Sequence, residues 1–502
     1  MTGLWISRAM LGIGRSCDYL SHIDPEAAKL PLYVDLDGTL IRGDTTQQAS
    51  LALLRTNPLA LLKAALVYGQ GRAASKKVIA DHMSLNAATL PYRPEVIDYI
   101  RKAKALGRRV VLATGAERRY ADAVASYLSL FDAVYATENG VNLTSSNKLE
   151  IMRRDGGQAF EYLGDSHADT AIFQHTTVSG WVGVKRIRLK PETARGLHRI
   201  CNEPVNRAHD VLRLIRPHQW TKNLLVVLPL LTAHKWGDTT AVWHTLLATL
   251  SLCLVASAGY VVNDALDMDA DQRHPEKRRR PLANGDVTLI FAAALALILL
   301  LVGFALAAVV NAGTLALIAG YLALNLLYTI FLKRRLLIDV LALAALYSWR
   351  PVIGGQAAGV VLSEWLTTFC AFFFASLSLL KRYTELKANA DAHRDVELPG
   401  RGYQPQDAVV VQTVGLMCGI AAVLVMAFYV RQPIVMELYQ RPVWLWAWCP
   451  LIGYWTVRAW LLANRGSLHH DPVVFAFTDT RSYGVIVGMV LAAILAGAKG
   501  MP

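Results

Sequence analysis

Cysteine is scarce in this sequence: there are six in 502 residues, and no two of them form a CxxC pair. This scarcity excludes a disulfide framework and a cysteine-ligated metal site, so we expect reduced thiols. A signal-peptide layout is also missing, because charged residues interrupt the short apolar patch in residues 1–30. We therefore expect residues 1–27 to form a disordered or membrane-associated N-terminal segment.

Long apolar runs are absent before about residue 210 and frequent after it. A chain of 502 residues is too long for one ordinary core, so this change of composition predicts two domains. We expect a soluble domain at 28–200, a linker with an interfacial helix at 201–222 and a membrane domain at 223–502. The membrane domain has nine stretches of about the length of a transmembrane helix. They are residues 223–238, 243–262, 287–309, 313–331, 337–357, 364–381, 407–430, 441–463 and 482–499.

Cations are unevenly distributed among the connections of the membrane domain. Five Lys or Arg residues lie in 264–286, three in 333–335 and five in 381–401, whereas the alternate connections carry two at most. By the positive-inside rule the basic connections face the cytoplasm. This places the N-terminal domain in the cytoplasm and the C-terminus outside an inner (plasma) membrane. The lipid bilayer therefore accounts for the net charge of +13, and we expect no nucleic-acid partner.

Three segments of the soluble domain have the pattern of buried strands that end in polar residues. They are "LPLYVDLDGTL" (30–40) with Asp35 and Asp37, "GRRVVLATGAE" (107–117) ending at Thr114, and "AFEYLGDSHAD" (159–169) ending at Asp165. Helical patterns at 94–106 and 117–129 separate them. The alternation predicts an α/β fold with a parallel sheet, in which ligands gather at the carboxyl ends of the strands.

The polar residues at these strand ends suit phosphoryl transfer. Asp35 can attack phosphorus as a nucleophile, and Asp37 can protonate the leaving oxygen and then activate water. Thr114 can bind the phosphoryl oxygens, and Lys148 can offset their charge. Carboxylate oxygens are the ligands that Mg²⁺ prefers in proteins. The candidate metal ligands here are Asp35, Asp37, Asp165 and Asp169.

The order of these motifs, DxDGT, then a strand ending in Thr, then Lys, then GDSxxD, resembles the haloacid dehalogenase (HAD) phosphatase superfamily over residues 28–190. The resemblance implies a Rossmann-like sheet, an Mg²⁺-dependent phosphatase site and a small cap. The helical insert at about 41–95 is the candidate for that cap. Lys148 has another interpretation, because "NLTSSNK" has the pattern of a loop, and a lysine in a loop is usually solvated.

A cluster of acids and cations follows the second apolar stretch, in "NDALDMDADQRHPEKRRRPLANG" (263–285). Asp264, Asp267 and Asp271 are spaced i, i+3 and i+7, which puts three carboxylates on one face of a helix. Carboxylates this close repel one another unless cations lie between them, so we expect Mg²⁺ that bridges to a diphosphate. Positive-inside topology alone explains some of the cations that follow. The cations that can hold outer phosphate oxygens are Arg273, Lys277, Arg278, Arg279 and Arg280.

The pattern NDxxDxxxD after a second membrane helix resembles the UbiA family of intramembrane prenyltransferases, as do "RPHQWTKN" (216–223) and "YTIFLK" (328–333). The resemblance covers about 210–500 and implies an all-α bundle of nine membrane helices. One feature of the family is missing. Typical members carry a second Asp-rich motif after the sixth helix, where this chain has Lys381 and Arg382. A cationic half-site suits a second substrate that has its own phosphate.

This combination is similar to one branch, the decaprenyl-phosphate phosphoribosyltransferases, which join 5-phosphoribosyl 1-diphosphate (PRPP) to a polyprenyl phosphate and release diphosphate. The resemblance implies Mg²⁺ in both active sites and a catalytic role for the three aspartates of the Asp-rich face. It also implies phosphate-binding or substrate-binding roles for Lys222, Asn223, Asn263, Tyr328, Lys333, Asp339, Lys381 and Arg382.

Two such domains on one chain suggest two consecutive reactions. The transfer product would keep its 5-phosphate, and the phosphatase would remove it to give polyprenyl-phosphoryl ribose, a sugar donor for the cell envelope. Tethering raises the effective concentration of the second site near the first product. Two alternatives stay open: a conventional prenyltransferase with an aromatic acceptor, or a membrane half that transports or anchors lipid. Neither lipid length nor oligomeric state can be read from the sequence, and a homo-oligomer is one option.

Overall fold

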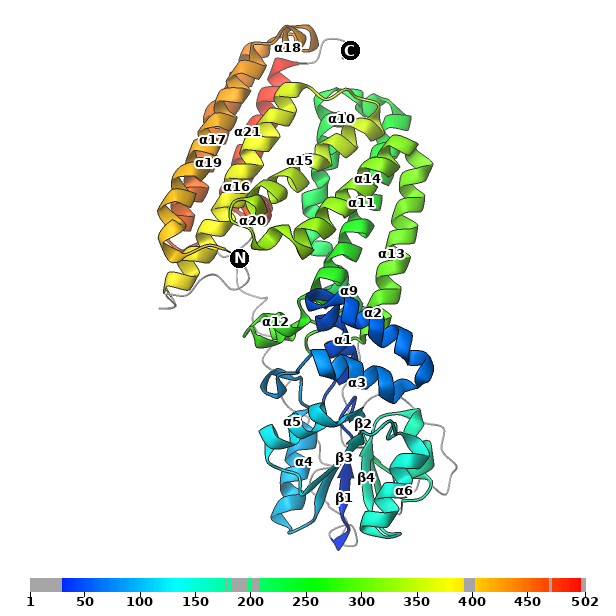
Figure 1. The fold of residues 1–502 in the computed structure, drawn as a ribbon. Coiled ribbons are helices and arrows are strands. Elements are labelled where there is room, and N and C mark those ends of the chain that lie inside the picture. Colours follow the sequence, from blue (N-terminus) through cyan, green and yellow to red (C-terminus); the bar gives the residue numbers. More distant parts are fainter. Residues whose placement is uncertain are drawn as a thin grey trace. The chain divides into compact units, whose positions relative to one another are not determined.

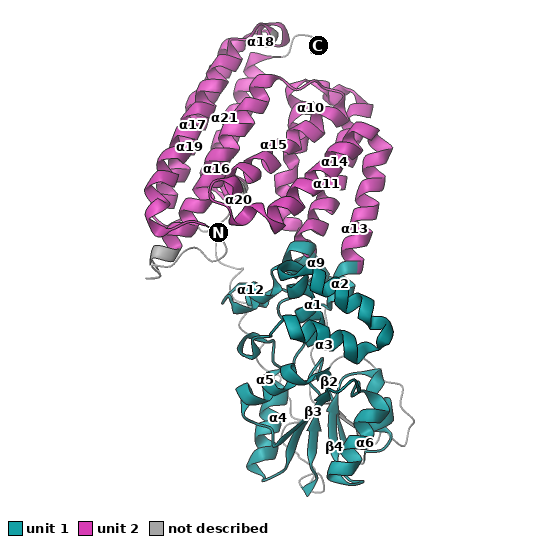
Figure 2. Ribbon diagram, viewed as in Figure 1, with its two compact units in different colours: residues 1–214, 262–293 teal, residues 215–261, 294–502 magenta. Residues whose placement is uncertain are grey.

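The computed structural model describes residues 29–176, 178–182, 197–199, 207–391, 402–468 and 472–497. The expected N-terminal segment (1–27) therefore lies outside the described residues, as does the start of the expected linker. The chain forms two compact units (Figures 1 and 2). Unit 1 is Met1–Leu214 with Val262–Ala293, and unit 2 is Ile215–Val261 with Ala294–Pro502.

Unit 1 is built on a six-stranded sheet in which all neighbouring strands are parallel, as predicted. The strands are β1 (Leu32–Val34), β2 (Val110–Glu117), β3 (Ala133–Thr137), β4 (Glu161–Gly164), β5 (Val178–Trp181) and β6 (Leu197–Arg199). Their order is β3-β2-β1-β4-β5-β6, so β2 and β4 flank β1. The three strands that carry the predicted motifs are thus adjacent. The regular pairing of β2 with β3 stops after Ala113. Thr114 therefore lies at an irregularity inside β2, and not at the end of the strand as predicted.

Helices cover both faces of the sheet, as expected when a strand directs alternate side chains to opposite sides. The helices are α4 (Pro94–Ala105), α5 (Arg118–Leu128), α6 (Ser145–Gly156) and α7 (Thr170–Phe173). Leu32 and Val34 of β1 pack in one layer with residues of α4 and α5. Tyr33, between them, packs in the other layer with residues of α6 and α7. The predicted helices at 94–106 and 117–129 are confirmed.

The insert between β1 and β2 is helical, as predicted for a cap. It contains α1 (Thr45–Thr56), α2 (Pro58–Val67), η3 (Tyr68–Gln70), α3 (Arg72–His82) and η4 (Ala87–Thr89). Asn57 separates α1 from α2, and its side chain accepts a hydrogen bond from the Ala60 amide at the start of α2. Leu53 and Ile79 are buried in a small core that these helices share. The insert is therefore a packed layer and not a loop.

Residues 262–293 pack within unit 1, although the sequence assigns them to the membrane domain. They include α12 (Met268–Arg273) and η8 (Lys277–Arg279). Gly285 has a φ of 75°, and a Cβ there would lie 2.6 Å from the Cβ of Arg42, so the backbone approaches closely at this point. The Arg42 guanidinium also pairs with Asp286 at 3.5 Å. The Asp-rich connection and the parallel-sheet domain thus form one compact unit.

Unit 2 is helical throughout its described residues. Its first part contains η6 (Pro217–Val227), α10 (Leu228–Thr232), η7 (Lys235–Gly237) and α11 (Thr239–Leu266), which runs on into unit 1. Next come α13 (Leu289–Val310), which begins in unit 1, α14 (Ala312–Ile330), η9 (Leu332–Arg334), α15 (Ile338–Ala358) and α16 (Glu364–Asp391). The rest comprises η10 (Pro405–Asp407), α17 (Ala408–Val430), α18 (Pro433–Leu438), η11 (Pro442–Ala447), α19 (Trp448–Asn464), α20 (Pro472–Thr478) and α21 (Thr480–Ala496).

Each of the nine predicted apolar stretches falls on helical structure in the described residues. The first, 223–238, is not one continuous α-helix but η6 followed by α10 and η7. Within the part of the chain that the structure describes, four segments are long and apolar enough to cross a membrane: Thr239–Leu266, Leu289–Val310, Ala312–Ile330 and Pro405–Val430. Their outer faces carry exposed side chains such as Leu301 and Met417. A lipid environment explains exposed apolar surface of this extent.

Candidate active sites

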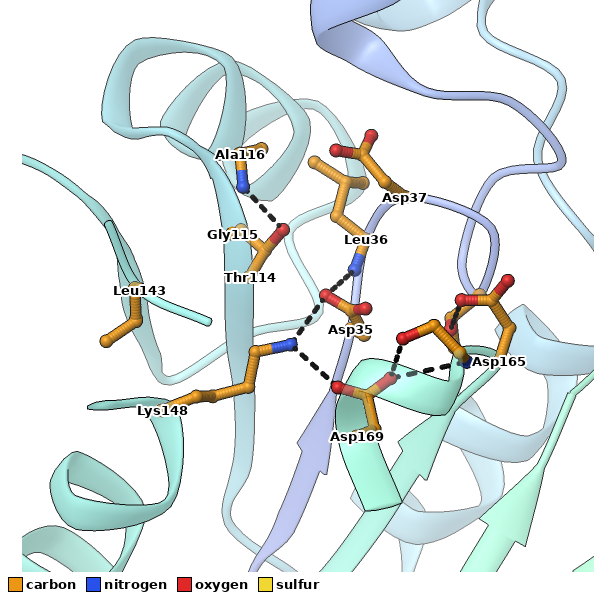
Figure 3. A network of polar contacts seen from close by, with 12 residues as sticks. Asp35, Leu36, Asp37, Thr114, Gly115, Ala116, Leu143, Lys148, Asp165 and Asp169 are labelled. Carbon is orange, nitrogen blue, oxygen red and sulfur yellow. Dashed lines mark hydrogen bonds and ion pairs between the residues drawn. The ribbon is translucent and has the colours of Figure 1, made fainter. Parts of the chain in front are cut away.

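Three carboxylates meet at the carboxyl ends of β1 and β4. Ligand oxygens of Asp35, Asp165 and Asp169 all lie within 4.8 Å of one another (Figure 3). A set of three carboxylates fits Mg²⁺, a hard cation that prefers oxygen ligands. The close approach depends on Gly38, because a Cβ there would lie 2.3 Å from an Asp165 oxygen. The structure thus brings together three of the four predicted metal ligands.

Lys148 lies beside this cluster, but in a different element from the one predicted. It belongs to α6, where its side chain is 3% exposed, so the prediction of a loop was wrong. The polar letters "TSSN" suggest a loop, yet Leu149 and Met152 supply the buried face of a helix. The Lys148 Nζ lies 3.1 Å from Asp35 and 3.5 Å from Asp169. Burial alone would lower the pKa of Lys148, but these two carboxylates raise it above its ordinary value.

Burial raises the pKa values of both Asp35 and Asp37. Burial raises the pKa of Asp35 to about 6, against the opposing effect of Lys148. Burial and nearby Asp44 raise the pKa of Asp37 well above its ordinary value. The Asp37 carboxylate accepts hydrogen bonds from the Thr45 amide (2.8 Å) and hydroxyl (3.2 Å). It points away from Asp169 in Figure 3 and does not join the carboxylate cluster formed by the described residues.

Thr114 is fully buried, and its hydroxyl accepts a hydrogen bond from the Ala116 amide at 3.0 Å. Two residues of this site escaped sequence reasoning. The Tyr162 hydroxyl accepts from Lys148 (3.0 Å) and donates to Asp169 (2.9 Å). Lys76 of the cap donates to the Gly115 carbonyl at 2.6 Å. Tyr162 lies in one of the predicted strands, but no local pattern marks Lys76, which only the fold brings to β2.

A cavity of about 780 Å³ opens over these residues within unit 1. Its polar wall includes Asp35, Asp37, Lys148, Asp165 and Asp169. The connection and the start of α13 contribute apolar residues to the lining, together with Asp286 and Thr288. The apolar residues are Leu282, Val287, Leu289, Ile290 and Phe291. The cavity therefore combines a cluster of carboxylates and a lysine with apolar side chains.

The Asp-rich face forms a second site, also in unit 1. The helix α11 ends at Leu266 and α12 begins after Asp267, so the three aspartates do not lie on one uninterrupted helix. One guanidinium nevertheless joins two of them: Arg280 Nη1 lies 3.0 Å from Asp264 and 2.6 Å from Asp271. These carboxylates therefore face each other, as their spacing predicted. The Arg280 guanidinium thus lies between the two carboxylates. Carboxylate oxygens are also ligands of divalent ions, so a divalent ion would favour the same position.

The remaining groups of this connection have other contacts. Asp267 pairs with Arg55 of α1 at 3.7 Å. Arg273 is exposed and pairs with Asp269 at 2.7 Å, while Lys277 and Arg278 are exposed on η8. Burial raises the pKa of Asp271, and Arg280 opposes that rise. Arg280 was one of five cations expected to hold phosphate oxygens, but the sequence of four consecutive cations did not show which one faces the acids.

In unit 2 the predicted residues form two groups. Arg382 is fully buried; its Nε lies 2.6 Å from Asp339, its Nη1 pairs with Glu385, and its Nη2 donates to the Tyr328 hydroxyl at 3.4 Å. The Tyr403 hydroxyl donates to Asp339 at 2.7 Å. Arg382 is therefore held by carboxylates of this chain. The second group contains Lys222 and Asn223, both buried on η6. Lys333 lies on η9 and Lys381 on α16, whereas Asn263, near the end of α11, belongs to unit 1.

Two family models match the chain. The UbiA prenyltransferase family matches residues 224–497, which is more than half of the chain, and the haloacid dehalogenase-like hydrolases match residues 32–173. These ranges agree with the all-helical unit and the parallel-sheet domain.

Individual relatives match either both domains or one of them. An uncharacterized protein of Sinorhizobium fredii is 34% identical over 92% of this chain and 90% of its own length, so the match includes both domains. The decaprenyl-phosphate phosphoribosyltransferase of Corynebacterium glutamicum is 35% identical over 36% of this chain and 56% of its own length. A UbiA homolog from Archaeoglobus fulgidus, solved with GPP and Mg²⁺, aligns with 56% of this chain and 99% of its own at 18% identity and a TM-score of 0.45.

Proposed function

Because the chain belongs to the UbiA prenyltransferase family and carries a haloacid dehalogenase-like domain ahead of that part, we propose that it is a bifunctional membrane enzyme. The first reaction transfers 5-phosphoribosyl from PRPP to a polyprenyl phosphate. The second removes the 5-phosphate to give polyprenyl-phosphoryl ribose. The similarity to decaprenyl-phosphate phosphoribosyltransferases supports the choice of substrates. So does Lys381, which lies where typical members of the family carry acids; its neighbour Arg382 pairs with Asp339 and Glu385 of this chain.

The main support for coupling the two reactions is the lining of the phosphatase cavity, which combines polar and apolar residues. A small water-soluble phosphate ester would leave Ile290 and Phe291 exposed to water in this cavity. A phosphorylated sugar attached to a lipid would place its apolar part against them. Since α13 continues from this wall as an apolar helix, the wall leads toward the environment where the lipid chain resides.

In the transfer reaction, an oxygen of the lipid phosphate forms a bond to the anomeric carbon of the ribose. The bond from that carbon to the diphosphate oxygen breaks, and diphosphate leaves. Asp264, Asp267 and Asp271 would hold Mg²⁺, which when bound neutralises the charge of the leaving diphosphate. Arg280 adds a guanidinium at the same carboxylates, within reach of outer phosphate oxygens.

In the hydrolysis, the Asp35 carboxylate attacks phosphorus and the bond to the 5-oxygen breaks. Asp37, whose raised pKa favours its protonated form, gives a proton to that oxygen. It then takes a proton from the water that attacks the phospho-aspartate, and inorganic phosphate leaves. Lys148 stabilises the negative charge that Asp35 and the phosphoryl group share. Asp35, Asp165 and Asp169 would hold Mg²⁺, which supplies further charge neutralisation when bound.

The distribution of Lys and Arg supports an inner-membrane location with the phosphatase domain and both sites on the cytoplasmic side. The charges of PRPP and of the phosphorylated product prevent their head groups from passing through lipid. A phosphatase on the cytoplasmic side would therefore meet the product on the side where it forms.

The test uses the purified full-length protein in detergent with Mg²⁺, PRPP and a polyprenyl phosphate, followed by mass spectrometry of the lipids. We expect polyprenyl-phosphoryl ribose from wild type and its 5-phosphate from Asp35→Asn. We expect ribosylated lipid to fall about 100-fold in Asp264→Asn. Asp269→Asn is the matched control for the transferase site, because Asp269 is exposed on α12 and pairs with Arg273 instead of Arg280.

A wild type that yields no ribosylated lipid, but instead moves a prenyl group from a prenyl diphosphate to an aromatic acceptor, would refute the proposal. Equal amounts of the dephosphorylated lipid from wild type and Asp35→Asn would refute the second reaction only. The half-buried Asp122, which pairs with Arg118 on α5, supplies the control Asp122→Asn for the phosphatase domain.

A further inference from the structure

One cation of the phosphatase cavity has no part in the hydrolysis described above. Lys76 lies on α3 of the cap and lines the cavity within unit 1. Its Nζ donates hydrogen bonds to the Gly115 carbonyl (2.6 Å) and to the Asn142 side-chain oxygen (3.1 Å). Among the described residues these two are its acceptors. An ammonium group has three N–H donors, so one of them remains for a ligand in the cavity.

The charge of Lys76 sets it apart from two other cations that line this cavity. Lys148 pairs with Asp35 at 3.1 Å, and Arg42 pairs with Asp286 at 3.5 Å. The acceptors of Lys76 are neutral, and in the described part of the chain no carboxylate lies within ion-pair distance of its Nζ. Lys76 therefore keeps a positive charge that no direct ion pair neutralises there.

Lys76 is nearer to the acid of the reaction than to its nucleophile. The carboxylates of Asp37 and Asp44 raise the pKa of Lys76 more than that of Asp35 does, although burial lowers this pKa overall. In the proposed hydrolysis Asp35 attacks phosphorus, and Asp37 gives a proton to the leaving oxygen. The Lys76 ammonium therefore lies on the side of the leaving group. An anion carried by that group would stabilise the charged form of Lys76, which burial disfavours.

The sheet domain holds both acceptors of Lys76 in place. The Thr137 hydroxyl, at the end of β3, donates to the Gly115 carbonyl at 2.8 Å. The Asn142 amide nitrogen donates to the Thr144 hydroxyl at 3.3 Å, which directs the amide oxygen toward Lys76. The ammonium therefore has a fixed position over the site, and a ligand need not order it on binding.

We propose that Lys76 determines the specificity of the phosphatase by binding a second anion on the leaving group, the phosphodiester that joins the ribose to the lipid. This inference rests on the proposed function, in which the substrate carries both a 5-phosphate and that diester. The 5-phosphate lies at Asp35, the diester at Lys76, and the lipid chain against the apolar side chains of the cavity. A sugar phosphate without the diester has no group for Lys76.

The test uses the purified full-length protein in detergent with Mg²⁺ and measures phosphate release from two soluble probes. The first is the 5-phosphoribosyl phosphodiester with a methyl group in place of the polyprenyl chain. The second is the methyl riboside 5-phosphate of the same anomer, which lacks the diester. We expect Lys76→Gln to lower kcat/KM for the first probe by about tenfold or more, because a charge-assisted hydrogen bond is lost. The value for the second probe should stay within about twofold of wild type, and Lys76→Arg should recover part of the loss.

Lys77→Gln is the matched control, because Lys77 is the next residue of α3 and is exposed. The same loss of charge there should leave both probes unaffected. Equal losses on the two probes in Lys76→Gln would overturn the inference, since a lysine that only closed the cap or bound the transferred phosphoryl group would affect every substrate alike. A wild type without preference for the diester would overturn it as well.

The two probes bypass the transferase, so this inference and the proposed transfer can fail separately. A wild type that forms no ribosylated lipid from PRPP, yet prefers the diester probe through Lys76, refutes the transfer and supports the inference. A wild type that forms the ribosylated lipid, while Lys76→Gln hydrolyses both probes as wild type does, refutes the inference and leaves the transfer standing. A wild type that hydrolyses neither probe refutes the phosphatase reaction and the inference together.

Discussion

In the two acid-rich sites of unit 1, different kinds of cation offset the repulsion between neighbouring carboxylates. In the phosphatase site the cation is Lys148, which is buried on α6 and fixed by the Tyr162 hydroxyl. In the Asp-rich connection it is Arg280, whose side chain is 27% exposed and follows a short 3₁₀ turn. A buried, bonded cation is a permanent part of its site, whereas a partly exposed guanidinium can be displaced. The difference suggests that only the second site exchanges its own cation for bound metal.

The largest expected effect separates the two sites completely. Asp35→Asn removes the nucleophile, so phosphatase turnover should fall by about 1000-fold or more. Diphosphate release by the transferase should stay within twofold of wild type. Phosphate and diphosphate release, measured on the same preparation, check both statements. A parallel loss of transfer would mean that the two sites are not independent.

The next effect tests the second site. Asp264 is 2% exposed and contacts Arg280, so Asp264→Asn should lower PRPP-dependent diphosphate release by about 100-fold. Hydrolysis of a simple phosphate ester should be unchanged. Asp269→Asn, on the exposed side of α12, should have almost no effect, because exposed ion pairs contribute little. Equal losses in both variants would contradict the assignment of Asp264.

These residues were predictable because the signals are local. Asp35 and Asp37 follow a buried strand, and Asp264 and Asp271 are seven residues apart on a helical pattern. What the sequence did not reveal depends on contacts across the fold. Lys148 is buried because Tyr162 and Asp169 come to it from β4 and the turn after it.

The same limit applies to the cations. Arg279 and Arg280 are neighbours with the same chemistry, and only the folded connection selects Arg280 for the acids. Arg350 is likewise an isolated cation in an apolar stretch, and its partners Asn223 and Tyr321 lie 127 and 29 residues away. No local pattern could have assembled them.

A third experiment examines the exchangeable cation directly. Arg280→Gln removes the guanidinium between two buried carboxylates, so Mg²⁺ no longer competes with it. We expect the Mg²⁺ concentration for half-maximal transfer to fall about fivefold, and the metal-free protein to lose thermal stability. Arg279→Gln, an exposed neighbour, is the control. An increased Mg²⁺ requirement would show that Arg280 supports the metal instead of competing with it.

The phosphatase site should depend on pH through Asp35. Its pKa of about 6 means that below this pH the carboxyl carries a proton and no longer attracts a divalent cation. Affinity for Mg²⁺ should therefore fall as pH falls and level off above pH 7. At pH 5.5 about one quarter of Asp35 is ionised, so half-maximal hydrolysis should need about four times more Mg²⁺ than at pH 7.5. Equal requirements at both pH values would contradict the raised pKa.

The smallest effect concerns Asp37. Thr45→Val removes the hydroxyl that lies 3.2 Å from its carboxylate but keeps the amide hydrogen bond at 2.8 Å. One hydrogen bond contributes about 1 kcal/mol, so the loss in kcat of hydrolysis should be about threefold to fivefold. The ionised form of Asp37 loses a hydrogen-bond donor, so the pKa of Asp37 should rise further. The part of the pH profile of hydrolysis that reports this pKa should therefore move to higher pH. Thr45→Ser keeps the hydroxyl and should behave as wild type. A loss in kcat without a shift of the pH profile would mean that Thr45 supports the cap and not Asp37.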